Sequence, residues 1–175
     1  MKKDLIVLLA LILLAVVLIS GIDVKSVDEY YLLHAEDVKP GDPTVTVSVD
    51  ASAAVKAGGK TVETLLSLGD LPKDGMLLTG TTLVLREGDN AFGLFLRAAR
   101  IHKLTIEHKG SEKSLSGVYV KGVNGLSEFS CGSSSGWVFT VNGKAPEMSP
   151  SAYHPQDGDV IEWRFETDLN EFFGF

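Results

Sequence analysis

The hydrophobic and polar positions divide the chain into two parts, the first of which is one long apolar run. This run, Leu5 to Ile22, has 18 residues and no charged side chain. A helix of that length is about 27 Å long, close to the thickness of the hydrocarbon core of a bilayer. Lys2 and Lys3 precede the run, which places the N-terminus in the cytoplasm and the rest of the chain outside it. The pattern therefore predicts a single-pass membrane anchor over residues 1–22.

A cleaved signal peptide is the alternative interpretation of the same run. Signal peptidases need small residues at the last and third-last positions before the cut. Cleavage after Ser20 or Gly21 would leave Leu18 or Ile19 at the third-last position, which fits poorly. Two localisations stay open: a domain tethered outside the cytoplasm at the cell membrane, and a domain secreted after cleavage.

The rest of the chain begins with a polar, acidic segment, residues 23–43. It ends on Pro40-Gly41-Asp42-Pro43, a combination that stops a helix. We interpret it as a stalk between the membrane and a folded domain, with packing against that domain as the alternative. The folded domain is then expected over residues 44–175.

Strand-like alternation dominates this domain. Valines alternate with polar residues in Thr44–Asp50, which is typical of a half-buried strand. Only Ala91–His102 shows the three/four spacing of a helix, preceded by the capping residues Asp89 and Asn90. Further strands are predicted over residues 81–85, 104–108, 118–120, 137–141 and 160–165. The sequence thus predicts an α+β domain with mostly antiparallel strands around one helix, and Asn142-Gly143 predicts a tight hairpin turn.

Composition and charge restrict the function. The formal net charge is −7; residues 1–22 contribute +1, so the remaining 153 residues carry −7 − (+1) = −8. Such a balance argues against a nucleic-acid partner, because phosphate binding needs a basic surface. The single cysteine, Cys131, excludes an intrachain disulfide framework and a CxxC-type zinc site.

The sequence shows no group of residues with the spacing of a catalytic or metal-binding site. The four histidines are scattered without metal-ligand spacing, and no nucleotide-binding or hydrolase signature is present. We therefore expect no catalytic residues, no metal site and no enzyme activity.

Three motifs carry a family resemblance: Gly117–Leu126 (GVYVKGVNGL), Ser135–Gly143 (SGWVFTVNG) and Asp157–Trp163 (DGDVIEW). They resemble the transcobalamin-like C-terminal domain family, a bacterial domain of unknown function similar to the C-terminal domain of transcobalamin and intrinsic factor. The resemblance covers about residues 44–169. It implies a small β-grasp-like α+β domain and a surface that faces a corrin ring.

Candidate ligand contacts lie around the second of these motifs. Trp137 and Phe139 follow a Ser/Gly loop, and an aromatic shelf beside small residues can stack on a planar ligand. The alternative is that both aromatics are sheet core. The predicted ligand-binding residues are Ser134, Ser135, Gly136, Trp137, Phe139 and Tyr153.

Two functions remain open at this point. The first is a membrane-tethered, extracytoplasmic ligand-binding module with cobalamin or a related corrinoid as its ligand and a transporter or surface protein as its partner; no other cofactor is expected. The second is a cell-surface interaction or adhesion module without a small-molecule ligand. The aromatic end of the chain, Phe172 to Phe175, either packs on the domain or serves as a docking tail.

Overall fold

The computed structural model describes residues 3, 6, 37–111 and 117–174. The predicted anchor Leu5–Ile22, apart from Ile6, lies outside the described residues. Residues 23–36 of the predicted stalk also lie outside them. Within the described part of the chain, no helix has the length and apolarity needed to cross a membrane.

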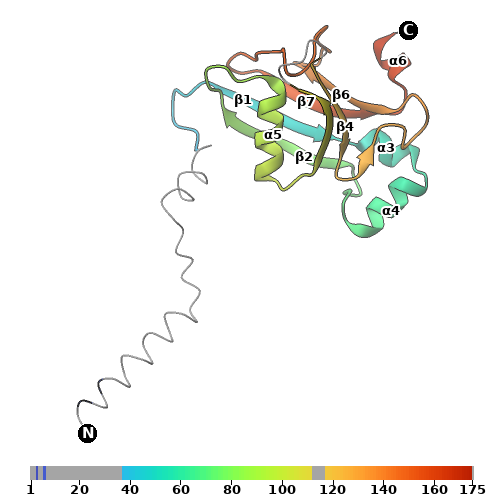
Figure 1. Ribbon diagram of the computed structural model, residues 1–175, viewed down its shortest axis with the longest axis horizontal. Coiled ribbons are helices and arrows are strands. Elements are labelled where there is room, and N and C mark those ends of the chain that lie inside the picture. Colours follow the sequence, from blue (N-terminus) through green and yellow to red (C-terminus); the bar gives the residue numbers. More distant parts are fainter. Residues whose placement is uncertain (1–2, 4–5, 7–36, 112–116, 175) are drawn as a thin grey trace. The chain divides into compact units, whose positions relative to one another are not determined.

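A four-stranded sheet forms the centre of the domain (Figure 1). It consists of β1 (Thr44–Asp50), β2 (Met76–Val84), β6 (Gly136–Val141) and β7 (Val160–Glu166), in the order β2-β1-β7-β6. The central strands β1 and β7 run parallel, whereas β1–β2 and β6–β7 are antiparallel pairs. Two antiparallel pairs are thus joined through a parallel pair between the first and last strands, as the α+β prediction allows.

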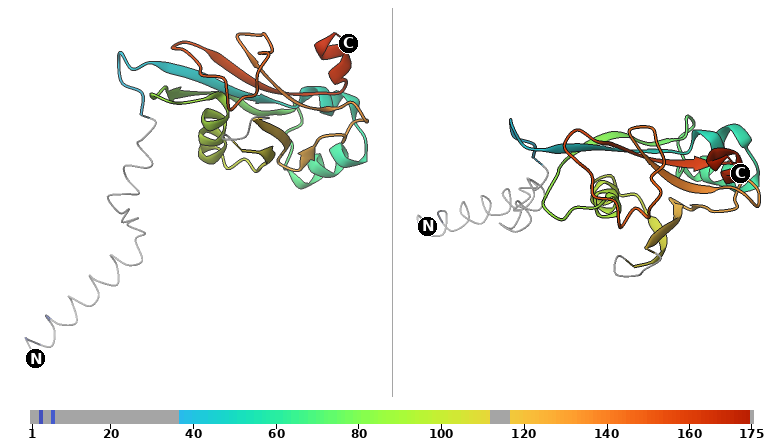
Figure 2. Two further views of the ribbon diagram at one scale, coloured as in Figure 1. Left: turned by 45° about the horizontal axis from the view of Figure 1, so that its top comes forward. Right: turned by 90° about the horizontal axis from the view of Figure 1, so that it is seen from above.

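One face of this sheet is covered by the helix α5 (Ala91–Ile101) and by the second sheet (Figure 2). The valines of β1 and the residues Ile161, Trp163 and Phe165 of β7 are buried. Phe95 of α5 stacks on Trp163 with ring centroids 4.2 Å apart. The side chain of Asn90 accepts a 2.8 Å hydrogen bond from the backbone N–H of Gly93, which confirms the predicted helix and its cap.

The second sheet contains β3 (Ile106–Gly110), β4 (Val118–Val123) and β5 (Leu126–Ser127), in that order. Both pairs are antiparallel. β4 turns into β5 through Asn124 and Gly125, whose φ angles of 48° and 79° are in the left-handed region that tight two-residue turns use.

The prediction of a single helix was wrong. Three further helices are present among the described residues: α3 (Ser52–Ala57), α4 (Lys60–Leu68) and α6 (Leu169–Phe173). They have six, nine and five residues, too few for their periodicity to be decisive or for the helices to be stable alone. Tertiary burial stabilises α4, whose Val62 and Leu65 side chains lie in the core.

The turn at Asn142-Gly143 is confirmed, but the hairpin expected from it is not. Both residues have positive φ, 52° and 77°, and the turn closes through one bridge between Val141 and Lys144. The chain then leaves the ladder at Ala145-Pro146, since proline has no N–H to donate. β6 pairs instead with β7, which begins only at Val160.

Candidate functional site

An apolar cavity of about 300 Å³ lies between β4 and β6. Three consecutive residues of each strand, 118–120 and 137–139, contribute to its wall. In a strand, consecutive side chains point to opposite faces, so a cavity lined by all three lies along the strand's edge. We call this cavity the β4–β6 slot. Its other lining residues, none of them charged, are Ala145, Pro146, Met148, Pro150, Trp163, Leu169 and Phe173.

The slot follows the outer edge of β6. Among the described strands, β6 pairs with β7 alone. The Asn142 N–H donates to the Val160 carbonyl oxygen at 2.9 Å, and antiparallel pairs alternate along the ladder. The backbone N–H and C=O groups of Trp137 and Phe139 therefore point away from β7, toward the slot. Val141, the next residue in this series, already exchanges both of its backbone hydrogen bonds with Lys144.

The two predicted aromatics belong both to the core and to the slot wall. Trp137 is buried, and its Nε1–H donates a 2.8 Å hydrogen bond to the Leu126 carbonyl oxygen. Phe139 stacks on Trp163 at a centroid distance of 5.5 Å and meets Tyr153 edge-on at 6.3 Å. Both rings are thus part of the core, as the alternative interpretation has it, and both also line the slot.

Trp163 also lines the slot and carries an unpaired, buried donor. Its side chain is buried, and its Nε1–H makes no hydrogen bond to the described residues. An unpaired buried donor is costly.

Ser134 holds the helix α6, which closes one side of the slot. Its hydroxyl donates to Asp168 Oδ1 at 2.9 Å and accepts from Asn170 Nδ2 at 2.9 Å, and its carbonyl oxygen accepts from the Leu169 N–H at 2.8 Å. Asp168 also caps the first turn of α6. The hydrogen bond from Ser134, followed by those from the helix N–H groups, lowers the pKa of Asp168. Ser134 therefore positions Leu169 and Phe173.

Ser135 and Gly136, which follow Ser134, also adjoin the wall of the slot. The buried Ser135 hydroxyl donates to the Gly132 carbonyl oxygen at 2.9 Å and accepts from the Cys131 N–H at 3.1 Å. A Cβ at Gly136 would lie 3.2 Å from Leu169 Cδ1, so glycine lets α6 approach β6 closely. Tyr153 lies behind Phe139, and burial, followed by the charge of Asp159, raises its pKa. Of the six predicted ligand residues, Trp137 and Phe139 line the slot and the other four adjoin it.

The Tyr119 hydroxyl is the polar group that borders the slot on the β4 side. Burial and a hydrogen bond to the Glu128 carboxylate raise the pKa of Tyr119 to about 12. Glu128 also lies 3.7 Å from Lys121 Nζ. The Tyr119 O–H therefore donates to Glu128, and its oxygen faces the slot only as a hydrogen-bond acceptor.

Sequence reasoning missed the β4 wall, the loop over residues 145–150 and the contribution of α6. Two signals for them were present. Met148 is an apolar residue between two prolines, Pro146 and Pro150, and Leu169 and Phe173 have the four-residue spacing of one helical face. A Cβ at Gly117 would collide with Ser149, which shows how tightly this loop packs against the start of β4.

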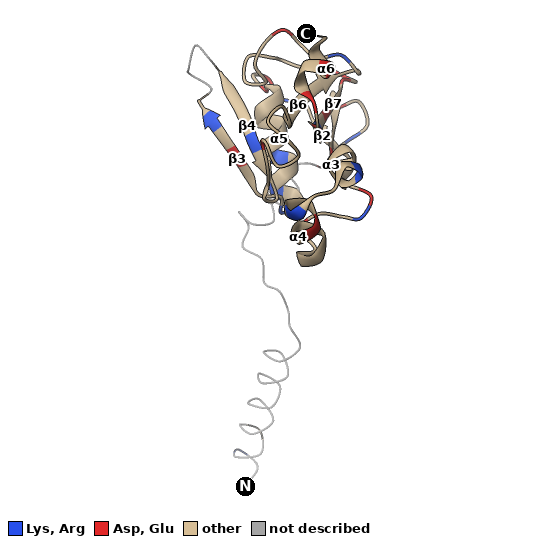
Figure 3. Ribbon diagram, turned by 90° about the vertical axis from the view of Figure 1, so that its right-hand side faces the viewer, with Lys and Arg blue, Asp and Glu red and all other residues tan. Residues whose placement is uncertain are grey.

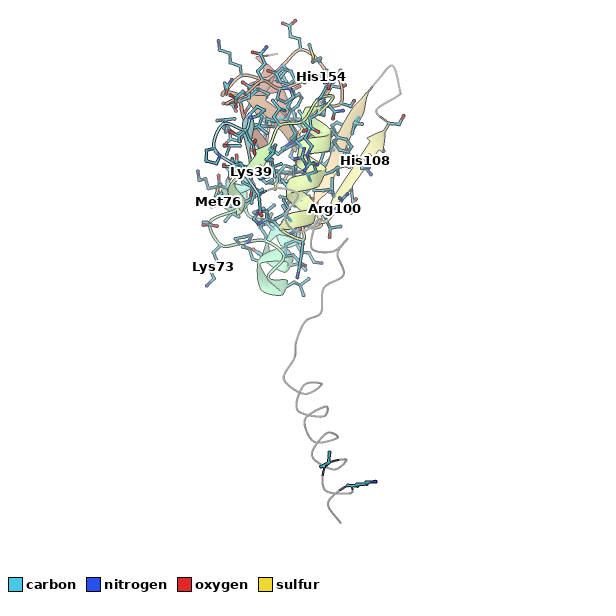
Figure 4. The ribbon with its side chains drawn as sticks, turned by 90° about the vertical axis from the view of Figure 1, so that its left-hand side faces the viewer. Lys39, Lys73, Met76, Arg100, His108 and His154 are labelled. Atoms are coloured by element: carbon cyan, nitrogen blue, oxygen red, sulfur yellow. The ribbon has the colours of Figure 1, made fainter. Side chains whose placement is uncertain are left out.

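No reactive cluster accompanies the slot. In the described ranges, no three His, Cys, Asp or Glu side chains gather where they could hold a metal ion. His108 of β3 and His154 of the loop before β7 lie apart (Figure 4); the first packs against Phe92, and the second bonds the Asp89 carbonyl oxygen through Nδ1. Burial raises the pKa of Cys131, which disfavours its thiolate.

The fold and the slot define a small α+β domain with an apolar, uncharged cavity between its two sheets. Residues 96–167, which are 72 of the 175 residues, match the family described as a domain of unknown function (DUF4430). All three motifs of the predicted resemblance lie within this match, which confirms the resemblance. No curated protein matches the chain.

Two solved structures resemble the chain at low identity. Haptocorrin in complex with Cbi is 15% identical with a TM-score of 0.45, and the similarity covers 75% of this chain and 27% of that one. The chain thus spans about a quarter of the haptocorrin chain. A candidate metal-binding protein from Ruminococcus gnavus ATCC 29149 is 14% identical with a TM-score of 0.41, and the similarity covers 71% of this chain and 97% of that one.

Proposed function

We propose that this domain is a ligand-binding module whose ligand occupies the β4–β6 slot. The observation that carries the proposal is the slot itself: about 300 Å³, aromatic and aliphatic walls, and no charged lining residue. Ligand sites are typically apolar cavities of about 300–1,000 Å³ with a few directed polar groups. Here the Tyr119 hydroxyl and the outward backbone groups of Trp137 and Phe139 are the directed groups. The site offers binding and orientation rather than catalysis.

A corrinoid such as cobalamin is the ligand that we propose. The family resemblance supports it, together with the β-grasp-like order of the four-stranded sheet. A corrin ring is larger than the slot, so only an edge or side arm would enter, and the ring would rest on the rim. Met148 and Phe173 form that rim, with 52% and 49% of their surfaces exposed.

We further propose that residues 5–22 tether the domain to the outer side of the cell membrane, where it would pass its ligand to a transporter. The uncharged run and the preceding lysines support this arrangement. Secretion after cleavage is the competing outcome. Protease treatment of intact spheroplasts that express the full chain distinguishes them, because a tethered domain is digested from the membrane fraction and a secreted one is found in the medium.

Calorimetric titration of the full chain in detergent micelles with cyanocobalamin tests the ligand. We expect saturable binding that the variant Met148→Glu weakens by about tenfold or more, since it places a charge on the apolar rim. Leu68→Glu is the matched control, because Leu68 is an exposed apolar residue of α4 that does not line the slot. Absence of binding up to about 1 mM cyanocobalamin, a free energy near −4 kcal/mol, would exclude a corrinoid ligand.

A further inference from the structure

Two unpaired strand edges border the slot. On β6, the outward backbone groups are those of Trp137 and Phe139. On β4, the β5 partner covers only Gly122 and Val123. The Asn124 N–H donates to the Thr105 carbonyl oxygen at 2.9 Å, so alternation along β3 also turns Lys109 toward its partner Tyr119. The backbone groups of Val118 and Val120 therefore point away from β3, toward the slot.

Other sheet edges in the domain carry features that discourage strand addition, whereas β6 does not. The edge strand β3 contains Glu107, His108 and Lys109 (Figure 3). The edge strand β2 shows register shifts against β1, and its Val84 carbonyl oxygen accepts a hydrogen bond from Arg97. Charges, irregular register and occupied carbonyls are ways in which proteins protect an edge. β6, from Gly136 to Val141, has no charge and no proline.

We propose that the β4–β6 slot binds an extended peptide segment, which adds to β6 as a further strand. The peptide backbone would pair with the N–H and C=O groups of Trp137 and Phe139. Residues two apart in a strand are about 6.8 Å apart, so a stretch of three peptide residues reaches both. Strand addition of this kind takes its affinity from main-chain hydrogen bonds and its specificity from alternate side chains.

The two sides of the slot define which side chains such a peptide carries. Both sets of alternate side chains would meet the uncharged lining of the slot, which includes Val118, Val120, Val138, Leu169 and Phe173. Because no lining residue is charged, a charged side chain on either set would lose its hydration without a partner. The peptide is therefore uncharged and apolar or β-branched over these positions. The inference rests on the proposed function only in taking the slot as the ligand site.

Binding of a blocked pentapeptide of alternating valine and threonine to the full chain in detergent micelles tests this inference. Two N-methylated forms serve as probes, one methylated at the even and one at the odd amides. Only one of these sets faces β6, so methylation of that set should weaken binding by about tenfold or more and methylation of the other should not. Equal affinity of the two methylated forms, or no binding up to about 1 mM, overturns the inference.

Amide exchange measured by NMR locates the contact. The peptide should slow exchange at Trp137 and Phe139, while Val138 and Thr140, which already pair with β7, serve as internal controls. Binding without slower exchange at Trp137 and Phe139 overturns the inference. A parallel titration with cyanocobalamin keeps the two proposals separate: peptide binding alone supports the inference and excludes the corrinoid, and corrinoid binding alone does the reverse.

Discussion

The Trp137 indole N–H donates a 2.8 Å hydrogen bond to the carbonyl oxygen of Leu126. Trp137 lies in β6 of the four-stranded sheet, and Leu126 lies in β5 of the second sheet. This bond therefore joins the two sheets next to the slot. Since Trp137 is buried and also packs edge-on against Phe165 at 5.4 Å, it holds β6 at a fixed distance from the second sheet.

Replacement of the Trp137 indole should lower the free energy of unfolding. Trp137→Phe keeps an aromatic ring but removes the N–H that donates to the Leu126 carbonyl oxygen, and one such hydrogen bond contributes about 0.5–1.5 kcal/mol. Chemical denaturation should show a loss of that size in the free energy of unfolding, in addition to the loss of packing.

Trp163→Phe is the matched control for this experiment. Trp163 is equally buried, but its Nε1–H makes no hydrogen bond to the described residues. Its replacement removes packing alone and should destabilise the domain less than Trp137→Phe. Equal losses in the two variants would show that the Trp137–Leu126 bond contributes little.

Loss of the Ser134 hydroxyl should release α6 from the slot. Ser134→Ala removes the bond to Asp168 and the one from Asn170. We expect faster amide exchange over Leu169–Phe173 with little change in the core, and weaker ligand binding. Ser133→Ala is the control, because Ser133 is exposed and its hydroxyl has no hydrogen bond to the part of the chain that the structure describes. A helix that exchanges equally fast in both variants contradicts the role of Ser134.

The docking of α6 should also depend on pH. The pKa of Asp168 is lowered in the folded state, first by Ser134 and then by the helix N–H groups. The stabilising contribution of its carboxylate is therefore complete above the ordinary Asp pKa of about 4, and it is lost as the pH falls through the lower folded-state pKa. Carbon NMR titration of the Asp168 carboxyl should show this lowered pKa, and Ser134→Ala should raise it.

Tyr119 should titrate abnormally at high pH. Burial and Glu128 raise its pKa to about 12, against an ordinary value of about 10. The stability that this neutral phenol contributes is complete below about pH 10 and is lost as the pH rises toward the folded-state pKa. The difference in ultraviolet absorbance between the native chain and Tyr119→Phe, followed as the pH rises, reports this titration. Glu128→Gln should lower the pKa of Tyr119, and an unchanged value would exclude Glu128 as a cause.

Alanine substitutions at two glycines distinguish the cost of backbone strain from the cost of a steric collision. Gly143 and Gly117 have φ angles of 77° and 68°, so alanine at either costs about 1–2 kcal/mol in backbone strain. A Cβ at Gly143 meets nothing within 4 Å, whereas one at Gly117 collides with Ser149. Gly117→Ala should therefore destabilise the domain more and displace the loop that lines the slot. Ser149→Gly in the same chain should recover part of the loss, and no recovery would contradict a collision.

Local sequence patterns predicted the elements that depend on local chemistry. The alternation in Thr44–Asp50, the three/four spacing after Asn90, and the turn at Asn142-Gly143 each gave the observed conformation. The helices α3, α4 and α6 escaped prediction because they are short and depend on tertiary contacts. The site was only partly predictable for the same reason: Trp137 and Phe139 stood out as aromatics, but nothing local connected them to Val118 or Phe173.

The sequence by itself determined which side chains of each strand face the core, because that choice follows from the period of two and the burial of apolar groups. Only the tertiary structure decided which strands are neighbours. Val47 pairs with Ile161 across the parallel centre of the sheet, and that pairing leaves β6 as an outer strand with a free edge beside β4. The slot exists because of this arrangement, and strand pairing between distant segments depends on the packing of the whole core rather than on local sequence.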